Sequence, residues 1–349
     1  MCLLSFFNKK ENTRFSHFPR IGSGTEDERV INMAKYIIKR VILAVLTIWL
    51  VATLTFFLMH AVPGGPFIAE KSISPQAIEA LNKKFGMDKS VPEQYMTYMF
   101  GSKNEETGKV EGGVIRGDFS LSLRQRGFTV ARIITTKFPV SAKVGGLAIL
   151  LALIVGIPLG SIAALNRGKW ADNVILVFTT CGIAFPSFVI CTVTMYLFSM
   201  KLGILPSGGL DFGTSYILPV FSLSFYPMAY ITRLMRSSML DVVGQDYMRT
   251  ARAKGLPQAV CLFKHALRNA ILPVVTYLGP MIASTLSGSF IVEKIFRIPG
   301  LGGQFVSSIT NRDYTVIMGT TIFYAALVIV MILLVDILYK LIDPRIELK

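Results

Sequence analysis

Charged residues are scarce in this sequence, because Asp, Glu, Lys and Arg together make up only 16% of its 349 residues. An ordinary soluble domain has about 25%. Hydrophobic residues make up 52%, and the mean hydropathy is +0.55. These residues are concentrated in long runs without charge, which excludes an ordinary soluble protein and is typical of a polytopic membrane protein.

Cysteine is also rare, with four residues in the whole chain. Cys181 and Cys191 lie on one predicted span, about 15 Å apart along a helix, which is too far for a disulfide. Cys2 and Cys261 fall in segments predicted to be cytoplasmic, where thiols stay reduced. No CxxC pair or His-rich motif accompanies them, so we expect neither a disulfide framework nor a metal site.

Motifs for catalysis are missing as well. The three histidines belong to no HExxH motif and to no nucleophile arrangement. Neither Gly108-Lys109 nor Gly168-Lys169 is followed by Ser or Thr, so the chain has no phosphate-binding loop for ATP. We expect no catalytic residue and no cofactor. Active transport by such a chain would need a partner or an ion gradient.

Six apolar runs are long enough, or nearly long enough, to cross about 30 Å of hydrocarbon as helices. They are Val41–Met59, Val144–Leu165, Val174–Met200, Tyr216–Thr232, Ile271–Val292 and Thr315–Val335. Prolines mark the second to fifth runs, which indicates kinked helices covered by neighbouring helices. Small residues that would allow close packing are Gly145, Gly146, Gly156, Gly160, Gly279, Ala283 and Ser287, unless they face lipid. We therefore predict an all-α polytopic fold with six transmembrane helices.

On this pattern the chain divides into consecutive segments. They are a polar leader (1–32), a first transmembrane helix (33–60), an external segment (61–137), a core of five transmembrane helices (138–336) with a coupling loop (233–270), and a cytoplasmic tail (337–349). The leader contains neither a span nor a signal-peptide core, so we expect it to be dispensable. The external segment has a helix-like stretch, 75–85, and a turn-rich stretch, 112–126, which predict a folded cap.

Basic residues give the chain a net charge of +15 and lie mainly beside the spans. They precede the first run, fill the loops after the second and fourth runs, and follow the sixth run. With six spans these four flanks lie on one side of the membrane, and the positive-inside rule places that side and both termini in the cytoplasm. We therefore attribute the positive charge to topology and expect no nucleic acid partner.

Acidic residues are nearly absent from the runs, since Glu293 and Asp336 occur only at their ends. Ion-coupled carriers usually bury charged residues within their spans. Asp336 precedes Lys340 by four positions, which suits a structural helix pair, with a gating role as the alternative. The pattern counts against a secondary carrier, which stays open as the alternative class together with a membrane-embedded enzyme.

The segment after the fourth run is too polar to enter lipid but is regularly patterned. Asp246 can cap a short helix that runs through Lys254, and Gly255 can end it in a left-handed turn. Tyr247, Ala251 and Gly255 recur at four-residue steps, so one face of small residues would lie on one side. Such a helix could insert into a groove on another protein or lie on anionic lipid, and the pattern leaves both open.

The stretch Arg249-Thr-Ala-Arg-Ala-Lys-Gly255 resembles the EAA motif of ABC importer permeases. RTARAKGLP followed by HALRNAILPVV is similar, more narrowly, to the first membrane subunit of the oligopeptide/dipeptide permease family. Further similar stretches are Ala61-Val-Pro-Gly-Gly-Pro66, Gly117-Asp-Phe119, Phe138-Pro-Val-Ser141, Pro299-Gly-Leu-Gly302, Asn311-Arg-Asp-Tyr314 and Asp343-Pro-Arg345. The resemblance covers 33–349. It departs from the general EAA pattern in having Arg249 in place of Glu and Leu272-Pro273 seventeen positions after the glycine.

The resemblance implies a type I ABC importer in the cell (inner) membrane. Its implied partners are a second homologous permease, two ATP-binding ATPase subunits and an external substrate-binding protein. The residues implied to couple this chain to the ATPase are Asp246, Arg249, Thr250, Ala251, Lys254 and Gly255. The implied cargo is oligopeptides, with dipeptides, nickel or metallophores, and glycosides as alternatives, and the substrate-binding residues are unknown.

Overall fold

A computed structural model describes residues 26–62, 65–67, 75–103, 110–257 and 260–342. The predicted leader up to residue 25 and the tail from residue 343 lie outside the described residues, as do the side chains of Asp336 and Lys340. The chain divides into two compact units, one of residues 1–43 with 348–349 and one of residues 44–347. The described residues of the first unit, 26–43, all belong to helix α1, which begins at Glu26.

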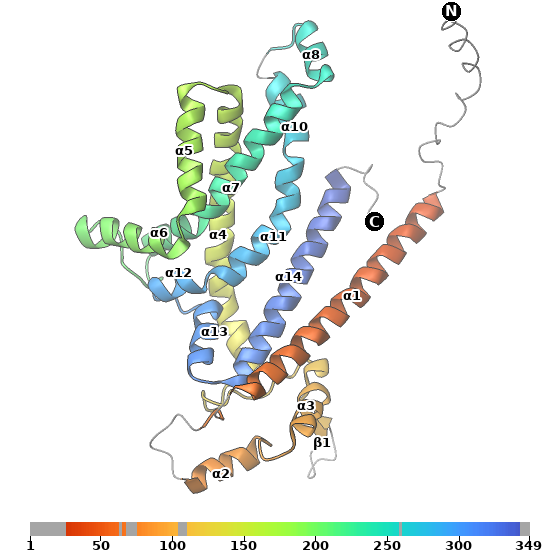
Figure 1. Ribbon diagram of the computed structural model, residues 1–349, viewed down its shortest axis with the longest axis vertical. Coiled ribbons are helices and arrows are strands. Elements are labelled where there is room, and N and C mark those ends of the chain that lie inside the picture. Colours follow the sequence, from red (N-terminus) through yellow and green to blue (C-terminus); the bar gives the residue numbers. More distant parts are fainter. Residues whose placement is uncertain (1–25, 63–64, 68–74, 104–109, 258–259, 343–349) are drawn as a thin grey trace, which may run out of the picture. The chain divides into compact units, whose positions relative to one another are not determined.

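The described residues are mostly helical (Figure 1). The helices are α1 (Glu26–Ala61), α2 (Pro75–Lys84), α3 (Val91–Phe100), α4 (Val130–Leu165), α5 (Trp170–Ala184), α6 (Ser187–Thr194), α7 (Ile217–Val243), α8 (Asp246–Ala253), α10 (Leu267–Ala270), α11 (Leu272–Gly288), α12 (Phe290–Ile295), α13 (Leu301–Thr310) and α14 (Tyr314–Ile342). Shorter 3-10 and π turns are η1 (Val114–Arg116), η2 (Met195–Lys201), η3 (Gly213–Tyr216) and η4 (Cys261–Ala266). Strands β1 (Ser102–Lys103) and β2 (Val110–Glu111) form a small antiparallel ribbon, with Ser102 opposite Glu111. The predicted all-α class is confirmed.

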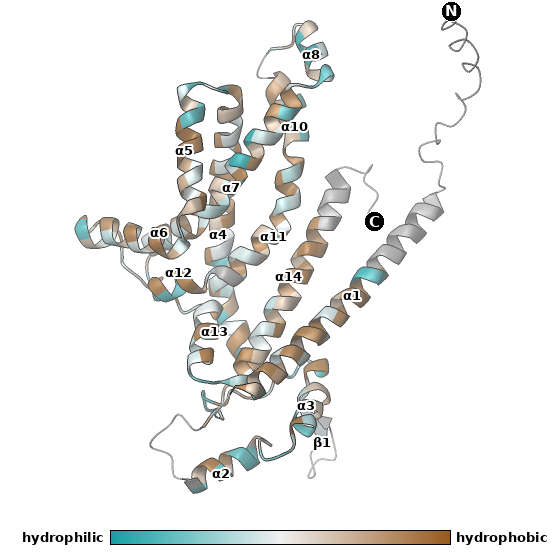
Figure 2. Ribbon diagram, in the orientation of Figure 1, coloured by the Kyte–Doolittle hydropathy of each residue, from teal (hydrophilic) through white to brown (hydrophobic). Residues whose placement is uncertain are grey.

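Four stretches are long and apolar enough to cross a membrane, namely Ile38–Ala61, Val130–Leu165, Leu272–Ile295 and Tyr314–Val335. A fifth arises if α5 and the stretch Ser187–Lys201 count as one span. These five cover five of the six predicted runs, and α1 and α14 are largely apolar where they are coloured (Figure 2). The remaining run, Tyr216–Thr232, lies in α7, which is a continuous helix of 27 residues but is not among those candidates.

The third predicted run is not one straight helix. α5 ends at Ala184, Phe185 is extended, and α6 starts after Pro186 in a direction that differs by 106°. The reason is local, because the proline ring excludes the residue before it from the helical region. The sequence predicts a kink at Pro186, and the structure shows a break.

Helix α4 is longer than its predicted run. It begins at Val130 with Thr129 as its N-cap, whose hydroxyl accepts a hydrogen bond from the Arg132 backbone N–H at 3.2 Å. Residues 130–137, which the sequence places in the external segment, are therefore helical. Pro139 and Pro158 both lie inside the helix.

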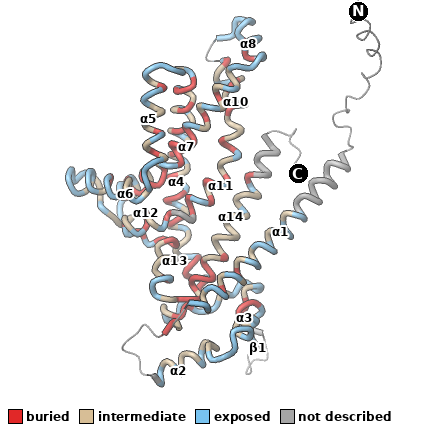
Figure 3. Tube along the Cα trace, viewed as in Figure 1, coloured by how far each residue is buried: buried red, intermediate tan, exposed pale blue. Residues whose placement is uncertain are grey.

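One core cluster of the second unit lies where α4 packs on α7, and buried residues gather there (Figure 3). A Cβ atom at Gly160 would lie 2.5 Å from the Thr232 carbonyl oxygen, and one at Gly156 would lie 3.0 Å from the Met228 carbonyl oxygen. Only glycine permits this approach of two backbones. Close packing within this chain is confirmed for these two glycines, for Gly145 and for Gly279, whereas Gly146 has open space. The Ser287 side chain lies outside the described residues.

The segment that the sequence predicts to be external is folded in its described residues. Phe67, Tyr98 and Met99 pack with Phe56 of α1 and with the first turns of α14. The loop after η1 is held by Asp313, which precedes α14 and accepts hydrogen bonds from the Ser122 hydroxyl and from the Leu123 N–H. Elements far apart in the sequence are thus fixed to one another at this end of the helices.

Candidate functional site

The predicted coupling loop contains a separate short helix, α8. Helix α7 continues to Val243, so residues 233–243 are helical and the loop begins later than predicted. Gly244 and Gln245 then separate α7 from α8 (Figure 1). The turn between α4 and α5 lies at the same end of α7, because Asp172 of α5 contacts Arg236 of α7.

Gly255 ends α8 in a left-handed conformation, with φ of +73°. The Leu256 N–H donates to the Ala251 carbonyl at 3.4 Å, and the Gly255 N–H donates to the Arg252 carbonyl at 2.9 Å. This pair of bonds is the Schellman arrangement, which satisfies the last carbonyls of a helix and requires a left-handed residue. The predicted stop is confirmed, with Lys254 as the C-cap.

The start of α8 differs from the prediction. Asp246 is the first helical residue, and Gln245 holds the capping position without a side-chain capping bond. Asp246 instead lies 3.6 Å from the Arg249 guanidinium, and the two side chains are 96% and 76% exposed. The negative charge of Asp246 in the first turn of α8 interacts favourably with the helix dipole. Its exposed ion pair with Arg249 adds little to stability.

One face of α8 is buried against its own chain. Met248 and Ala251 belong to a core cluster that also contains Cys261 and Ala266 of η4. Of the predicted face, Tyr247 and Gly255 are exposed, but Ala251 between them is covered. The buried face follows an i, i+3 step and uses the larger apolar side chain, Met248, which the search for small residues passed over.

The other predicted coupling residues remain accessible. Exposed side chains of α8 and its C-cap are Asp246, Arg249, Thr250, Arg252 and Lys254, and Gly255 is exposed too. A Cβ atom at Gly255 would meet nothing within 4 Å. Five of the six predicted residues are thus open to a partner, whereas Ala251 is covered. The exposed surface of α8 is largely basic. Its opposite face packs against the rest of the chain through Met248 and Ala251.

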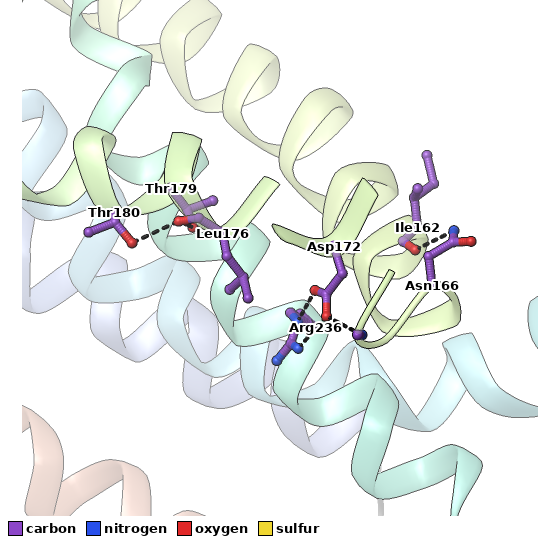
Figure 4. A network of polar contacts seen from close by, with 8 residues as sticks. Ile162, Asn166, Asp172, Leu176, Thr179, Thr180 and Arg236 are labelled. Carbon is purple, nitrogen blue, oxygen red and sulfur yellow. Dashed lines mark hydrogen bonds and ion pairs between the residues drawn. The ribbon is translucent and has the colours of Figure 1, made fainter. Parts of the chain in front are cut away.

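A buried ion pair fixes this end of the bundle, and no sequence motif pointed to it. The Arg236 Nε and a terminal guanidinium nitrogen donate to the two Asp172 carboxylate oxygens at 2.6 and 2.8 Å (Figure 4). The Gly168 N–H donates to the same carboxylate at 2.9 Å. The Asp172 side chain is only 2% exposed. The pair ties the α4–α5 turn to α7, ten residues before α8 begins at Asp246.

Removing Arg236 is expected to destabilise the protein. Arg236→Ala would leave the Asp172 carboxylate buried without its cation, and breaking a buried pair costs about 3–5 kcal/mol. Heating of the detergent-purified protein, followed by size-exclusion chromatography, should show a lower midpoint than wild type. Arg236→Lys should fall between, because it keeps the charge but loses the bidentate geometry. Arg249→Ala is the matched control and should not shift the midpoint, and an equal midpoint for Arg236→Ala would contradict a stabilising role.

A second buried carboxylate, Glu293, lies at the other end of the bundle. It accepts hydrogen bonds from the Ser141 hydroxyl at 2.7 Å, the Ser289 hydroxyl at 2.6 Å and the Gly303 N–H at 2.7 Å. These donors come from α4, the start of α12 and α13, so the carboxylate joins three elements. Within the described residues, no cluster of three or more His, Cys, Asp or Glu side chains could hold a metal ion.

Comparison with known proteins covers nearly the whole chain. Residues 156–348 match the family described as binding-protein-dependent transport system inner membrane component, and residues 33–145 match its N-terminal region. The dipeptide transport system permease protein DppB of Bacillus subtilis is 42% identical over 316 residues, which cover 90% of this chain and 99% of that protein. The oligopeptide transport system permease protein OppB of Haemophilus influenzae is 38% identical over 317 residues, which cover 90% of this chain and all of that protein.

Among solved structures, the methionine ABC transporter MetNI aligns with 62% of this chain and 97% of its own, at 14% identity and a TM-score of 0.49. The family assignment rests on the sequence matches, which extend over both halves of the chain. The relatives are transport permeases and not enzymes. The chain therefore belongs to the binding-protein-dependent transport system inner membrane components, as a permease subunit of an ABC importer.

Proposed function

We propose that this permease imports short peptides, oligopeptides first and dipeptides as the alternative. The observation that carries the proposal is the match to permeases named for dipeptide and oligopeptide transport, over 90% of this chain and almost their full length. Its test is ATP-dependent uptake of labelled peptides by the reconstituted complex. Uptake of a nickel chelate or a glycoside without any peptide would refute the substrate class.

The partners follow from the family and from what the sequence lacks. An ABC importer permease works with ATPase subunits and a substrate-binding protein, and this chain has no phosphate-binding loop. We propose that one copy pairs with a second, homologous permease and that two ATPase subunits complete the membrane complex. The substrate path would then lie between the two permeases.

Helix α8 is our candidate for the contact with an ATPase subunit. Its exposed basic face supports this role, and so does its anchoring. Met248 and Ala251 share one cluster with Met235 and Met239 of α7 and Val274 of α11. A displacement of α8 would therefore be transmitted to two helices of the bundle, because a packed core resists deformation. A helix that only rests on lipid would not need this rigid seating.

Both termini and α8 are proposed to face the cytoplasm, on the basis of the charged flanks. In a cysteine-free background, Ser102→Cys and Ser207→Cys should react in intact cells with an impermeant thiol reagent. Lys254→Cys should react only after the cells are opened. All three positions are exposed or lie on an exposed segment, so access within the chain does not limit labelling. The reverse pattern of labelling would overturn the orientation.

A further inference from the structure

Helix α7 has two unlike faces. One face packs on Gly156 and Gly160 of α4 and is apolar. The opposite face exposes Tyr226, Tyr230 and Arg233, at i, i+4 and i+7, with the two tyrosines 46% and 36% exposed. By contrast, the large exposed side chains of α1 are mostly Ile, Val, Leu and Phe, which suit lipid. The polar stripe of α7 therefore needs a different surrounding.

The tyrosines of this stripe form a cluster with α11. The Tyr230 ring lies 4.3 Å from the Tyr277 ring, and the Tyr226 ring lies 6.4 Å from the Tyr230 ring. Thr276, beside Tyr277, is exposed as well. A hydroxyl group in hydrocarbon without a hydrogen-bond partner is costly. Unlike Thr276, which bonds the Leu272 carbonyl of its own helix, a tyrosine hydroxyl is too remote to bond its own backbone.

Arg233 lies on the exposed face of α7, and its side chain extends along α5 to Thr180. The sequence assigns it to the cytoplasmic loop, but it lies within α7 and its guanidinium donates to the Thr180 hydroxyl of α5 at 2.9 Å. Trp170, at the start of α5, is 78% exposed and is suited to a membrane interface. Thr180 lies ten residues further along α5, which is about 15 Å along the helix axis. An ionisable side chain at such depth marks a substrate or ion pathway by default.

Arg233 also has capacity for another ligand. A guanidinium has five N–H donors, and one nitrogen contacts Thr180. Within the described part of the chain, no carboxylate lies within ion-pair distance of Arg233. The Asp172 carboxylate on the neighbouring helix α5 pairs with Arg236 instead. A carboxylate from outside this chain would complete the site with a charge-assisted, bidentate bond.

We propose that Tyr226, Tyr230 and Tyr277 line the substrate path and that Arg233 binds the C-terminal carboxylate of a passing peptide. The assignment rests on the proposed peptide function. The guanidinium supplies the charge complement to the terminus. The three rings present flat surfaces that accept side chains of different shapes, and their hydroxyls can bond peptide amides.

The test compares two peptides that differ only at the C-terminus, one with a free carboxylate and one with an amide. Uptake into proteoliposomes is measured with the complete complex and saturating binding protein, so that loading of the binding protein does not limit the rate. Arg233→Gln should slow uptake of the free-carboxylate peptide about tenfold or more, the effect of losing a hydrogen bond between charged groups. It should slow the amidated peptide less than twofold. Arg233→Lys should recover part of the loss, because it keeps the charge but not the bidentate geometry.

The controls separate three outcomes. Arg167→Gln removes a positive charge from the exposed α4–α5 turn and should slow both peptides equally little. An equal loss for both peptides in Arg233→Gln, with weaker co-purification of the second permease, would mean that the stripe packs against that subunit and would overturn the proposal. No loss for either peptide would overturn it too. If the wild-type complex transports neither peptide, the peptide function itself fails, which is a separate result.

Discussion

Gly255→Leu is expected to abolish ATP-coupled uptake while the protein still inserts and assembles with the proposed second permease. A side chain at this left-handed position costs about 1–2 kcal/mol in backbone strain, which is too little to unfold a membrane bundle. Inside the chain there is room, since a Cβ atom at Gly255 meets nothing within 4 Å. A large loss of function must therefore come from a surface that approaches α8 from outside. The readout is peptide uptake beside ATP hydrolysis stimulated by loaded binding protein, with the complex in nanodiscs.

Gly255→Asn separates backbone strain from contact with the partner. Asn tolerates the left-handed region better than other residues with side chains, so α8 should keep its Schellman end. If Gly255→Asn also uncouples hydrolysis from uptake, the partner approaches closely. If only Gly255→Leu does so, the size of the side chain at the contact decides.

The lipid alternative orders the variants differently. A helix that rests on anionic lipid should suffer most when Arg249, Arg252 and Lys254 are neutralised together, and Gly255→Leu could strengthen its binding. On the docking account these exposed charges are individually weak, so their single substitutions are milder than Gly255→Leu. Normal coupling in Gly255→Leu would remove the docking assignment.

Local chemistry made part of this fold predictable. Helices form over the predicted apolar runs. Gly255 has the left-handed conformation that its place after a short helix predicts. Gly156 and Gly160 of the second run face α7, because only glycine permits that close approach. In each case the residue type permits few other conformations or environments, so the structure can be predicted from one sequence.

The features that were missed depend on distant residues. The Asp172–Arg236 pair joins side chains that are 64 positions apart, and each alone is an ordinary charge beside a span. Met248 anchors α8 because η4 folds back under it, which the spacing within α8 does not reveal. Arg233 was counted with the basic flank, because sequence alone does not show that α7 continues past it or that its side chain reaches Thr180.

The second large effect concerns the source of energy. The chain has no phosphate-binding loop, and the described spans carry few charges that could couple an ion gradient to transport. Uptake should therefore stop completely without the ATPase subunits, and also with ATPase subunits that bind ATP but cannot hydrolyse it. A collapsed proton or sodium gradient should have no effect.

The most direct measurement is uptake of a labelled peptide into proteoliposomes that hold this chain with the proposed second permease and the two proposed ATPase subunits. Binding protein is added outside and ATP is enclosed inside. The account predicts accumulation only when ATP and loaded binding protein are both present, with ATP hydrolysis rising in the same preparations. Accumulation that follows an imposed ion gradient without ATP would contradict it and would identify a secondary carrier.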